Sequence, residues 1–124
     1  MKHLLITTIA AVLLVGCGPP PPDISIHEAA KKGNIEAIKQ HLAAGTDVNA
    51  KTGGGGTPLH YAANKEIAEL LIARGAAVNA KDEDGDTPLD IATHPDNPNA
   101  SAETTDLLRK HGGKTGEELK AEGK

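Results

Sequence analysis

Residues 57–63 read TPLHYAA, and residues 70–80, a few positions later, read LLIARGAAVNA. The two stretches have the features of a pair of short helices. Thr57 can cap a helix by accepting a hydrogen bond from a backbone N–H one turn in. Pro58 then occupies the first helical position, where its missing N–H would have had no helical partner. Gly75 follows the second apolar run, at the place where a left-handed residue ends a helix.

The same pattern recurs on both sides of this stretch. Before it, residues 24–34 read ISIHEAAKKGN and lead to GTDVNA at residues 45–50. After it, residues 87–92 read TPLDIA and lead to LLRKHG at residues 107–112. Ser25 takes the capping position in the first copy. Self-similarity at this spacing is typical of repeat proteins, in which each unit buries its apolar face only against its neighbours.

These motifs resemble the ankyrin repeat. The resemblance implies an all-α solenoid of about three helix-turn-helix repeats linked by short β-hairpin loops, which is about the minimum number that buries a continuous core. The expected ranges are 24–116 for the repeat domain, divided into 24–52, 53–82 and 83–116, and 117–124 for a polar tail or short capping helix. Thr115 and Glu118 predict a capping box for that helix, and Leu119 would cover the open apolar face of the last repeat.

The copies depart from the family pattern in three ways. The second is three residues shorter between its helices, the third carries a long loop from Thr93 to Ala102, and Asp90 replaces the family's histidine. Tyr61 is the one aromatic residue of the chain. The core must therefore consist of thin layers of Ala, Leu, Ile and Val.

The resemblance assigns structural roles to several polar side chains. The histidine ring of a repeat ties the capping Ser or Thr to the neighbouring backbone, and the capping set is Ser25, His27, Thr57, His60 and Thr87. His41 stands where the family usually has Leu, and we expect it to be half exposed. No Cys, Asp or Glu pair completes a metal site with these histidines. The sequence predicts no metal, no cofactor and no catalytic residues, because no nucleophile, base and orienting group can be brought together.

Ankyrin repeats bind partner proteins through hairpin tips and the exposed face of the inner helices. Mapped onto this chain, the partner-binding positions are Glu28, Lys31, Tyr61 and Ile91 on helices, and Lys51, Lys81, Glu83, Asp84 and Asp86 on hairpins. Two alternatives stay open. Tyr61 either anchors a partner or packs on the adjacent hairpin, and the acidic stretch 82–86 is either a solvated turn or a patch for a basic partner.

The N-terminus predicts a lipid anchor. After Met1-Lys2-His3, residues 4–15 form an apolar run of 12 residues, too short to span a bilayer. The run ends in LVGC, which resembles the bacterial lipoprotein signal and places the chain's single cysteine, Cys17, at the lipidated position. Residues 1–16 are then the signal peptide, and 17–23 a short Pro-rich tether. The alternatives are a plain signal peptide with a chance cysteine, or a buried thiol.

Charge and location complete the sequence-based hypothesis. The net charge is −4, which disfavours nucleic acid and anionic lipid as binding partners. Gly18 follows the cysteine where an aspartate would retain a lipoprotein in the inner membrane, which favours the outer membrane facing the periplasm. The leading prediction is a non-enzymatic, membrane-tethered module of the bacterial cell envelope that binds an unidentified protein. The alternative is an envelope inhibitor or immunity-type lipoprotein that blocks a toxin or an enzyme.

Overall fold

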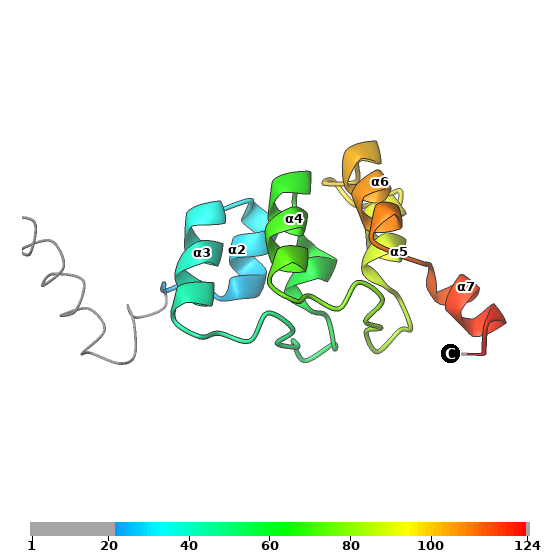
Figure 1. Ribbon diagram of the computed structural model, residues 1–124, viewed down its shortest axis with the longest axis horizontal. Helices are drawn as coiled ribbons and strands as arrows, with labels where there is room; N and C mark the ends of the chain where they lie inside the picture. The colour runs from blue at the N-terminus through cyan, green and yellow to red at the C-terminus, as the bar shows by residue number, and fades with distance from the viewer. Residues whose placement is uncertain (1–21, 124) are drawn as a thin grey trace, which may run out of the picture.

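A computed structural model describes residues 22–123 of the chain. It contains short helices stacked side by side along the long axis of the molecule (Figure 1). The elements are α2 (Ile26–Lys32), α3 (Ile35–Ala43), η1 (Pro58–Tyr61), α4 (Lys65–Ala73), α5 (Pro88–Thr93), α6 (Ala102–Lys110) and α7 (Gly116–Ala121). Three pairs, α2–α3, η1–α4 and α5–α6, form three successive repeats. The first member of each pair is called inner and the second outer.

Short polar side chains begin the helices, and Ser25 does so at the position that the sequence predicts. Ser25 Oγ accepts a hydrogen bond from the N–H of Glu28 at 3.1 Å, and starts the inner helix of the first repeat. The outer helices start at Asn34, Asn64 and Ser101, whose side-chain oxygens accept from backbone N–H groups three residues on. These caps satisfy N–H groups that have no partner within a helix.

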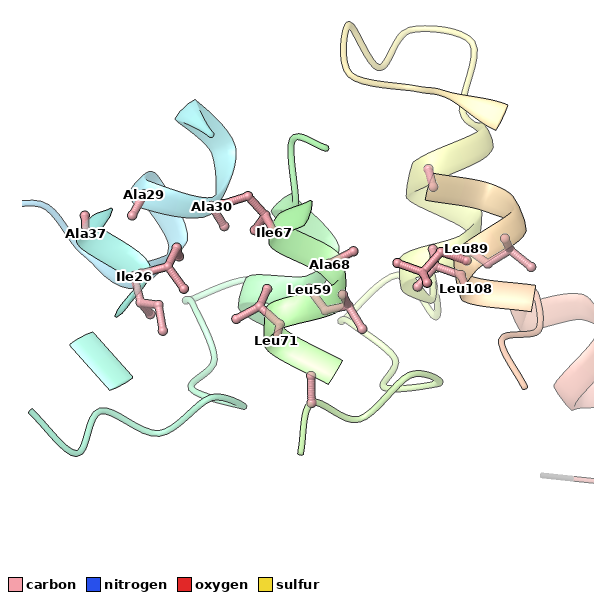
Figure 2. Packing of buried hydrophobic residues seen from close by; sticks show 14 residues of the cluster. Ile26, Ala29, Ala30, Ala37, Leu59, Ile67, Ala68, Leu71, Leu89 and Leu108 are labelled. Carbon is pink, nitrogen blue, oxygen red and sulfur yellow. The ribbon is translucent and has the colours of Figure 1, made fainter. Parts of the chain in front are cut away.

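The core is a continuous aliphatic layer between the helices (Figure 2). Ile38, Ile67 and Leu71 are fully buried. Ala29 and Ala30 are also fully buried, and their small side chains permit close approach of neighbouring backbones. The aliphatic composition of the core was predicted from the near absence of aromatic residues.

The second repeat differs from the predicted helix pair. Its inner element, η1, is a single 3-10 turn. The stretch from the motif histidine to the cap of the outer helix, His60 to Asn64, is three residues shorter than the stretch from His27 to Asn34 in the first repeat. Ala62 already leaves the helical conformation, with ψ 119°. The next N–H, that of Ala63, donates to the carbonyl of Ala30 in the first repeat at 2.9 Å. The shortened inner segment therefore has room for one turn only, and the neighbouring repeat supplies the hydrogen bond that a longer helix would have made.

The loops between repeats are tight turns. In the first, Thr52 N–H donates to Gly56 O at 2.9 Å; in the second, Asp82 N–H donates to Asp86 O at 3.0 Å. Within residues 22–123 neither loop extends into paired strands. A second backbone bond closes each turn, from Gly55 N–H to Thr52 O and from Gly85 N–H to Asp82 O. The predicted hairpins are thus present as tight turns, from which the chain passes directly into the next helix.

The C-terminal helix α7 confirms one prediction and corrects another. Thr115 Oγ1 accepts from Glu118 N–H at 3.1 Å while Glu118 Oε1 accepts from Thr115 N–H at 2.8 Å, which is the predicted capping box. Leu119 is buried but lies outside the main apolar cluster. It was expected to cover the open face of the last repeat. Polar bonds instead attach α7 to the stack, among them Arg109 Nη1 to Glu118 Oε1 at 2.8 Å.

The N-terminal predictions fall on residues that the structure does not describe. The apolar run 4–15, Cys17 and most of the Pro-rich tether precede residue 22. Among residues 22–123, none of the helices combines the length and the apolar character needed to cross a bilayer.

Candidate protein-interaction surface

The two loop tips form a row along one edge of the molecule (Figure 1). They are joined directly, because the N–H of Glu83 at the second tip donates to the carbonyl of Gly54 at the first, at 3.0 Å. Gly55, at the first tip, has φ 82°, and a side chain there would press on the backbone of Glu83 at 3.1 Å. Glycine at this position therefore permits both the left-handed turn and the close approach of the two tips.

An asparagine holds each end of this loop row to the following repeat. Asn49 Oδ1 accepts from Ala77 N–H at 2.8 Å, and its Nδ2 donates to Gly75 O at 3.2 Å. Thirty residues later Asn79 repeats the arrangement, accepting from Lys114 N–H at 2.7 Å and donating to Gly112 O at 3.0 Å. Val-Asn-Ala recurs at residues 48–50 and 78–80, but the sequence pattern alone did not predict a role for the asparagine. Its recurrence at one position in two copies was the available signal.

His60 links the inner turn of the second repeat to the second loop. Its Nδ1 accepts from Thr57 N–H at 3.0 Å, so that nitrogen carries no proton. Its Nε2 lies 2.9 Å from the carbonyl of Asp86 and therefore donates. The neighbours thus select the neutral Nε2–H tautomer. The Thr57 hydroxyl lies 2.9 Å from the same Nδ1, and Thr57 and His60 together form a capping box at the start of η1.

His27 makes the same outward bond by a different local arrangement. Its Nε2 donates to the carbonyl of Ala50 at 2.7 Å. Its ring does not bond the capping Ser25, contrary to expectation, and Ser25 instead accepts from Glu28 N–H. Ser25 precedes His27 by two residues, whereas Thr57 precedes His60 by three. The shorter spacing does not let the ring fold back onto its own cap.

Asp90 occupies the corresponding position in the third repeat and reverses the outward bond. Its Oδ2 accepts from Thr87 N–H at 3.0 Å and from Gly116 N–H at 2.7 Å. The Thr87 hydroxyl donates to the carbonyl of Lys114 at 2.6 Å. The group that follows the third repeat is therefore an N–H, for which a carboxylate is the appropriate acceptor. This accounts for the departure from histidine noted in the sequence.

His41 is buried, and the prediction of a half-exposed ring was wrong. It is 6% exposed. Its Nε2 donates to the carbonyl of Ile24 at 2.7 Å, and its Nδ1 lies 3.2 Å from Thr46 Oγ1. The ring ties the chain that enters the domain to the turn after α3. A leucine could not satisfy that carbonyl.

The acidic tip of the second loop is ordered from within. Asp82 Oδ1 accepts from the N–H groups of Asp84 and Asp86, both at 2.9 Å. Carboxylate oxygens of Asp82, Asp84 and Asp86 lie within 4.8 Å of one another. Burial, together with the charges of Asp82, Asp90 and Asp84, raises the pKa of Asp86, while His94 opposes the rise. Negative charge is thus concentrated at this tip, and the ionised form of Asp86 is destabilised by it.

A hollow of about 200 Å³ lies between this tip and α7. Its charged lining consists of Asp84, Asp86, Asp90, Glu117, Lys81 and Lys120. Gly116 lines it too, and a side chain there would meet the carbonyl of Gly85 at 2.4 Å. Acids outnumber bases in the lining. The hollow therefore extends the acidic character of the tip toward the C-terminus.

The remaining predicted contact residues differ in how exposed they are. Lys31, Lys51, Lys81 and Glu83 are exposed, and Glu28 and Ile91 are half-buried. Tyr61 is also half-buried. Its hydroxyl lies 3.4 Å from Thr52 Oγ1, and its ring meets His27 edge-on with centroids 5.8 Å apart. In this structure Tyr61 packs on the first loop, which is the second of the two alternatives, and a role for it in partner binding stays a prediction.

Comparison with known proteins agrees with this architecture. A family model described as ankyrin repeats, in three copies, matches residues 26–115. Acyl-CoA-binding domain-containing protein 4 of Oryza sativa subsp. japonica is 48% identical over 40 residues, which cover 32% of this chain and 12% of that protein. Myotrophin of Xenopus laevis is 50% identical over 36 residues, and human myotrophin 47% over the same length.

The two myotrophin matches each cover 29% of this chain and 30% of the relative. The chain thus spans less than half of the length of the curated relatives that it matches, and those relatives inform the repeat rather than the activity of the whole protein. The family model, in contrast, covers most of the chain and all three helix pairs. This chain belongs to the ankyrin repeat family.

Proposed function

We propose that this protein is a non-enzymatic module that binds another protein at a bacterial membrane, to which lipid on Cys17 attaches it. The observation that carries the binding function is the fixed loop row. Glu83 is hydrogen-bonded to Gly54, and Asn49 and Asn79 hold the two junctions, so the tips form one preorganised edge. A preorganised surface loses little conformational entropy when a partner binds.

The charge of that edge favours a basic partner. Glu83 and Asp84 are exposed at the tip, and the hollow beside them is lined by Asp86, Asp90 and Glu117. Burial raises the pKa of Asp86, and the negative charges of Asp82, Asp90 and Asp84 raise it further, as repulsion between neighbouring carboxylates would. A Lys or Arg side chain entering the hollow would relieve that repulsion. Complementary charge of this kind mainly increases the association rate and fixes orientation.

The membrane part of the proposal rests on the sequence before residue 22. A positive start, an apolar run of 12 residues and Leu14-Val15-Gly16-Cys17 together support lipidation of Cys17. Gly18 in place of a retention aspartate supports the outer membrane facing the periplasm. Two or more acyl chains would anchor the protein stably. The short Pro-rich tether would then hold the repeat domain near the membrane surface.

The partner is tested by crosslinking the tethered protein in cells and identifying the captured protein. Its association rate with purified wild type and with Asp84→Lys is then measured across a range of salt concentrations. We expect Asp84→Lys to slow association about tenfold or more at low salt and to flatten the salt dependence. Glu69→Lys, an equal charge reversal at an exposed site on α4, is the matched control. Equal rates for the two variants would remove the acidic edge from the binding site.

The captured protein also separates binding from inhibition. If it is an enzyme or a toxin whose activity falls when this chain is added, the inhibitor or immunity-type function replaces simple tethered binding. The anchor is tested separately, by mass spectrometry of the membrane fraction, in which we expect an acylated N-terminal Cys17. Membrane attachment that survives Cys17→Ala would contradict the anchor without touching the binding surface.

A further inference from the structure

The loop between α5 and α6 returns across the molecule. It runs along the edge opposite to the loop tips (Figure 1). Asn99 in this loop lies beside the end of α2, with its Nδ2 at 3.5 Å from the carbonyl of Lys31, 68 residues earlier in the chain. The contact joins the third repeat to the first. Solenoid repeats ordinarily contact only their immediate neighbours.

The loop has an internal frame that holds Asn99 in place. Asn97 Nδ2 donates to the carbonyl of Ile91 at 2.9 Å, and Asn97 Oδ1 accepts from Asn99 N–H at 2.9 Å. Asn97 N–H donates to the carbonyl of His94 at 3.0 Å, and its own carbonyl accepts from Ala100 N–H at 3.0 Å. Asn97 thus uses its amide and both of its backbone groups within the loop. These hydrogen bonds give the loop a defined conformation.

The end of α2 presents a carbonyl that needs such a partner. The last carbonyls of a helix have no bond within the helix. Two of those near the end of α2 are satisfied locally, Ala29 O by Asn34 N–H and Ala30 O by Gly33 N–H and by Ala63 N–H. The carbonyl of Lys31 is met by Asn99, which is itself half-buried. This hydrogen bond is long, so its own contribution to stability is small. The position of the loop beside the end of α2 is the more important feature.

The second repeat makes the crossing possible. Its inner element is a single turn, and Ala63 passes directly to α4 along the backbone of the first repeat. The inner element of the second repeat is therefore shorter than the inner helices of its two neighbours, α2 and α5.

We propose that residues 94–101 are a clasp that joins the third repeat to the first across the shortened second repeat. The clasp couples the two ends of the stack directly. It fixes the curvature of the face that the inner helices form. A domain of nearest-neighbour repeats alone would lack this coupling.

The test uses the full chain, labelled with ¹⁵N and ¹³C. Asn99→Asp preserves shape but cannot donate, and Asn99→Ala removes the amide. For both we expect the carbonyl ¹³C resonance of Lys31 to shift. Amide exchange at Gly33 and Asn34 should accelerate about twofold, the low end of the range for loss of one hydrogen bond, because the Asn99 bond is long. The amide of Leu71 in the intervening repeat should exchange at an unchanged rate.

Asp96→Ala is the matched control, because the Asp96 side chain is exposed in the same loop. It should leave the Lys31 resonance in place. Asn97→Ala, which removes the frame, should reproduce the effect of the Asn99 variants on the first repeat. An unchanged Lys31 carbonyl and unchanged Gly33 exchange in both Asn99 variants would overturn the clasp. So would acceleration that reaches Leu71 to the same extent, because that pattern reports general destabilisation.

Discussion

The second and third repeats each meet the segment that follows them at an equivalent position, but with opposite hydrogen-bonding chemistry. His60 donates outward to the carbonyl of Asp86, whereas Asp90, at the equivalent position, accepts from the N–H of Gly116. Both side chains also accept from the N–H of the threonine three residues earlier. The inward half of the motif is therefore common to the two repeats. The outward half is chosen by the backbone group that the next segment presents.

The two repeats also differ in length on the opposite edge. The second ends its inner element after one turn, and the third extends into the loop that carries Asn97 and Asn99. A repeat protein tolerates such changes because each unit needs only matching surfaces at its two sides. The comparison teaches that the aliphatic layers are uniform along the stack, while the polar junctions are specific to each position.

The largest expected effect on stability comes from truncating a buried side chain in the aliphatic core. Leu71 of α4 is fully buried in the central repeat. Leu71→Ala should lower the free energy of unfolding by about 2–5 kcal/mol, because it removes buried apolar area and leaves a cavity. Urea denaturation followed by circular dichroism measures the loss. Glu69→Ala, exposed on the same helix, is the control, and an equal loss in both would show that the layer assignment is wrong.

Exchanging the junction chemistry should have the next largest effect. His60→Asp would place an acceptor against the carbonyl of Asp86, and Asp90→His would place a second donor opposite the N–H of Gly116. Each leaves a partly buried group without its partner, and we expect each to lower stability by about 1–3 kcal/mol. Denaturant melts of both variants, beside His111→Asn at an exposed histidine, provide the measurement. If either swap is tolerated like the control, the junctions do not depend on donor and acceptor identity.

Removing the asparagine side chain at either repeat junction should have a smaller effect on stability, and the effect should be equal at the two junctions. Asn49 and Asn79 make equivalent pairs of bonds to the following segment. Asn49→Ala and Asn79→Ala should each lower stability by about 1 kcal/mol, the net value of a typical hydrogen bond. Thermal or urea unfolding of the two variants in parallel would show the match. A cost at one site alone would mean that the two junctions are not equivalent.

The smallest effect concerns the charges at the second loop. Burial first, and then Asp82, Asp90 and Asp84, raise the pKa of Asp86, so the folded state holds that proton more tightly than the unfolded chain. Ionisation of Asp86 therefore opposes folding at neutral pH, and the penalty disappears as pH falls through the folded pKa. Asp84→Asn should lower the pKa of Asp86, followed by NMR titration of its carboxyl carbon. Because the site is largely solvated, stability should rise by at most a few tenths of a kcal/mol.

Glu118 on α7 provides the comparison with the opposite sign. Its hydrogen bond from Thr115 N–H, and then its bond from Arg109, lower its pKa below the ordinary value. Ionised Glu118 therefore stabilises the folded state at pH values above its ordinary pKa, and this stabilisation is lost as the pH falls through its lowered pKa in the folded protein. Arg109→Gln should raise the pKa of Glu118 in the same titration and leave that of Asp86 unchanged. A shift of both would mean that the two groups belong to one electrostatic cluster.

Local sequence patterns were sufficient to predict the repeats and most helix starts. Ser25, Thr87 and Thr115 act at short range, since a cap and its N–H partner lie within one helical turn. The aliphatic core also followed from composition and period, because apolar residues three and four apart must share a face. These features depend on neighbours along the chain and can be read without knowing the fold.

Tertiary structure decided the features that depend on what another segment presents. Whether His41 is buried depends on the carbonyl of Ile24, and whether His60 or Asp90 suits a junction depends on Asp86 or Gly116 in the following segment. The single turn of η1 and the reach of Asn99 to Lys31 arise in the same way. Hydrogen bonds require a complementary group at a defined distance and angle. The sequence by itself therefore determined the repeat and its apolar layer, and only the stacking of the repeats determined the polar partners.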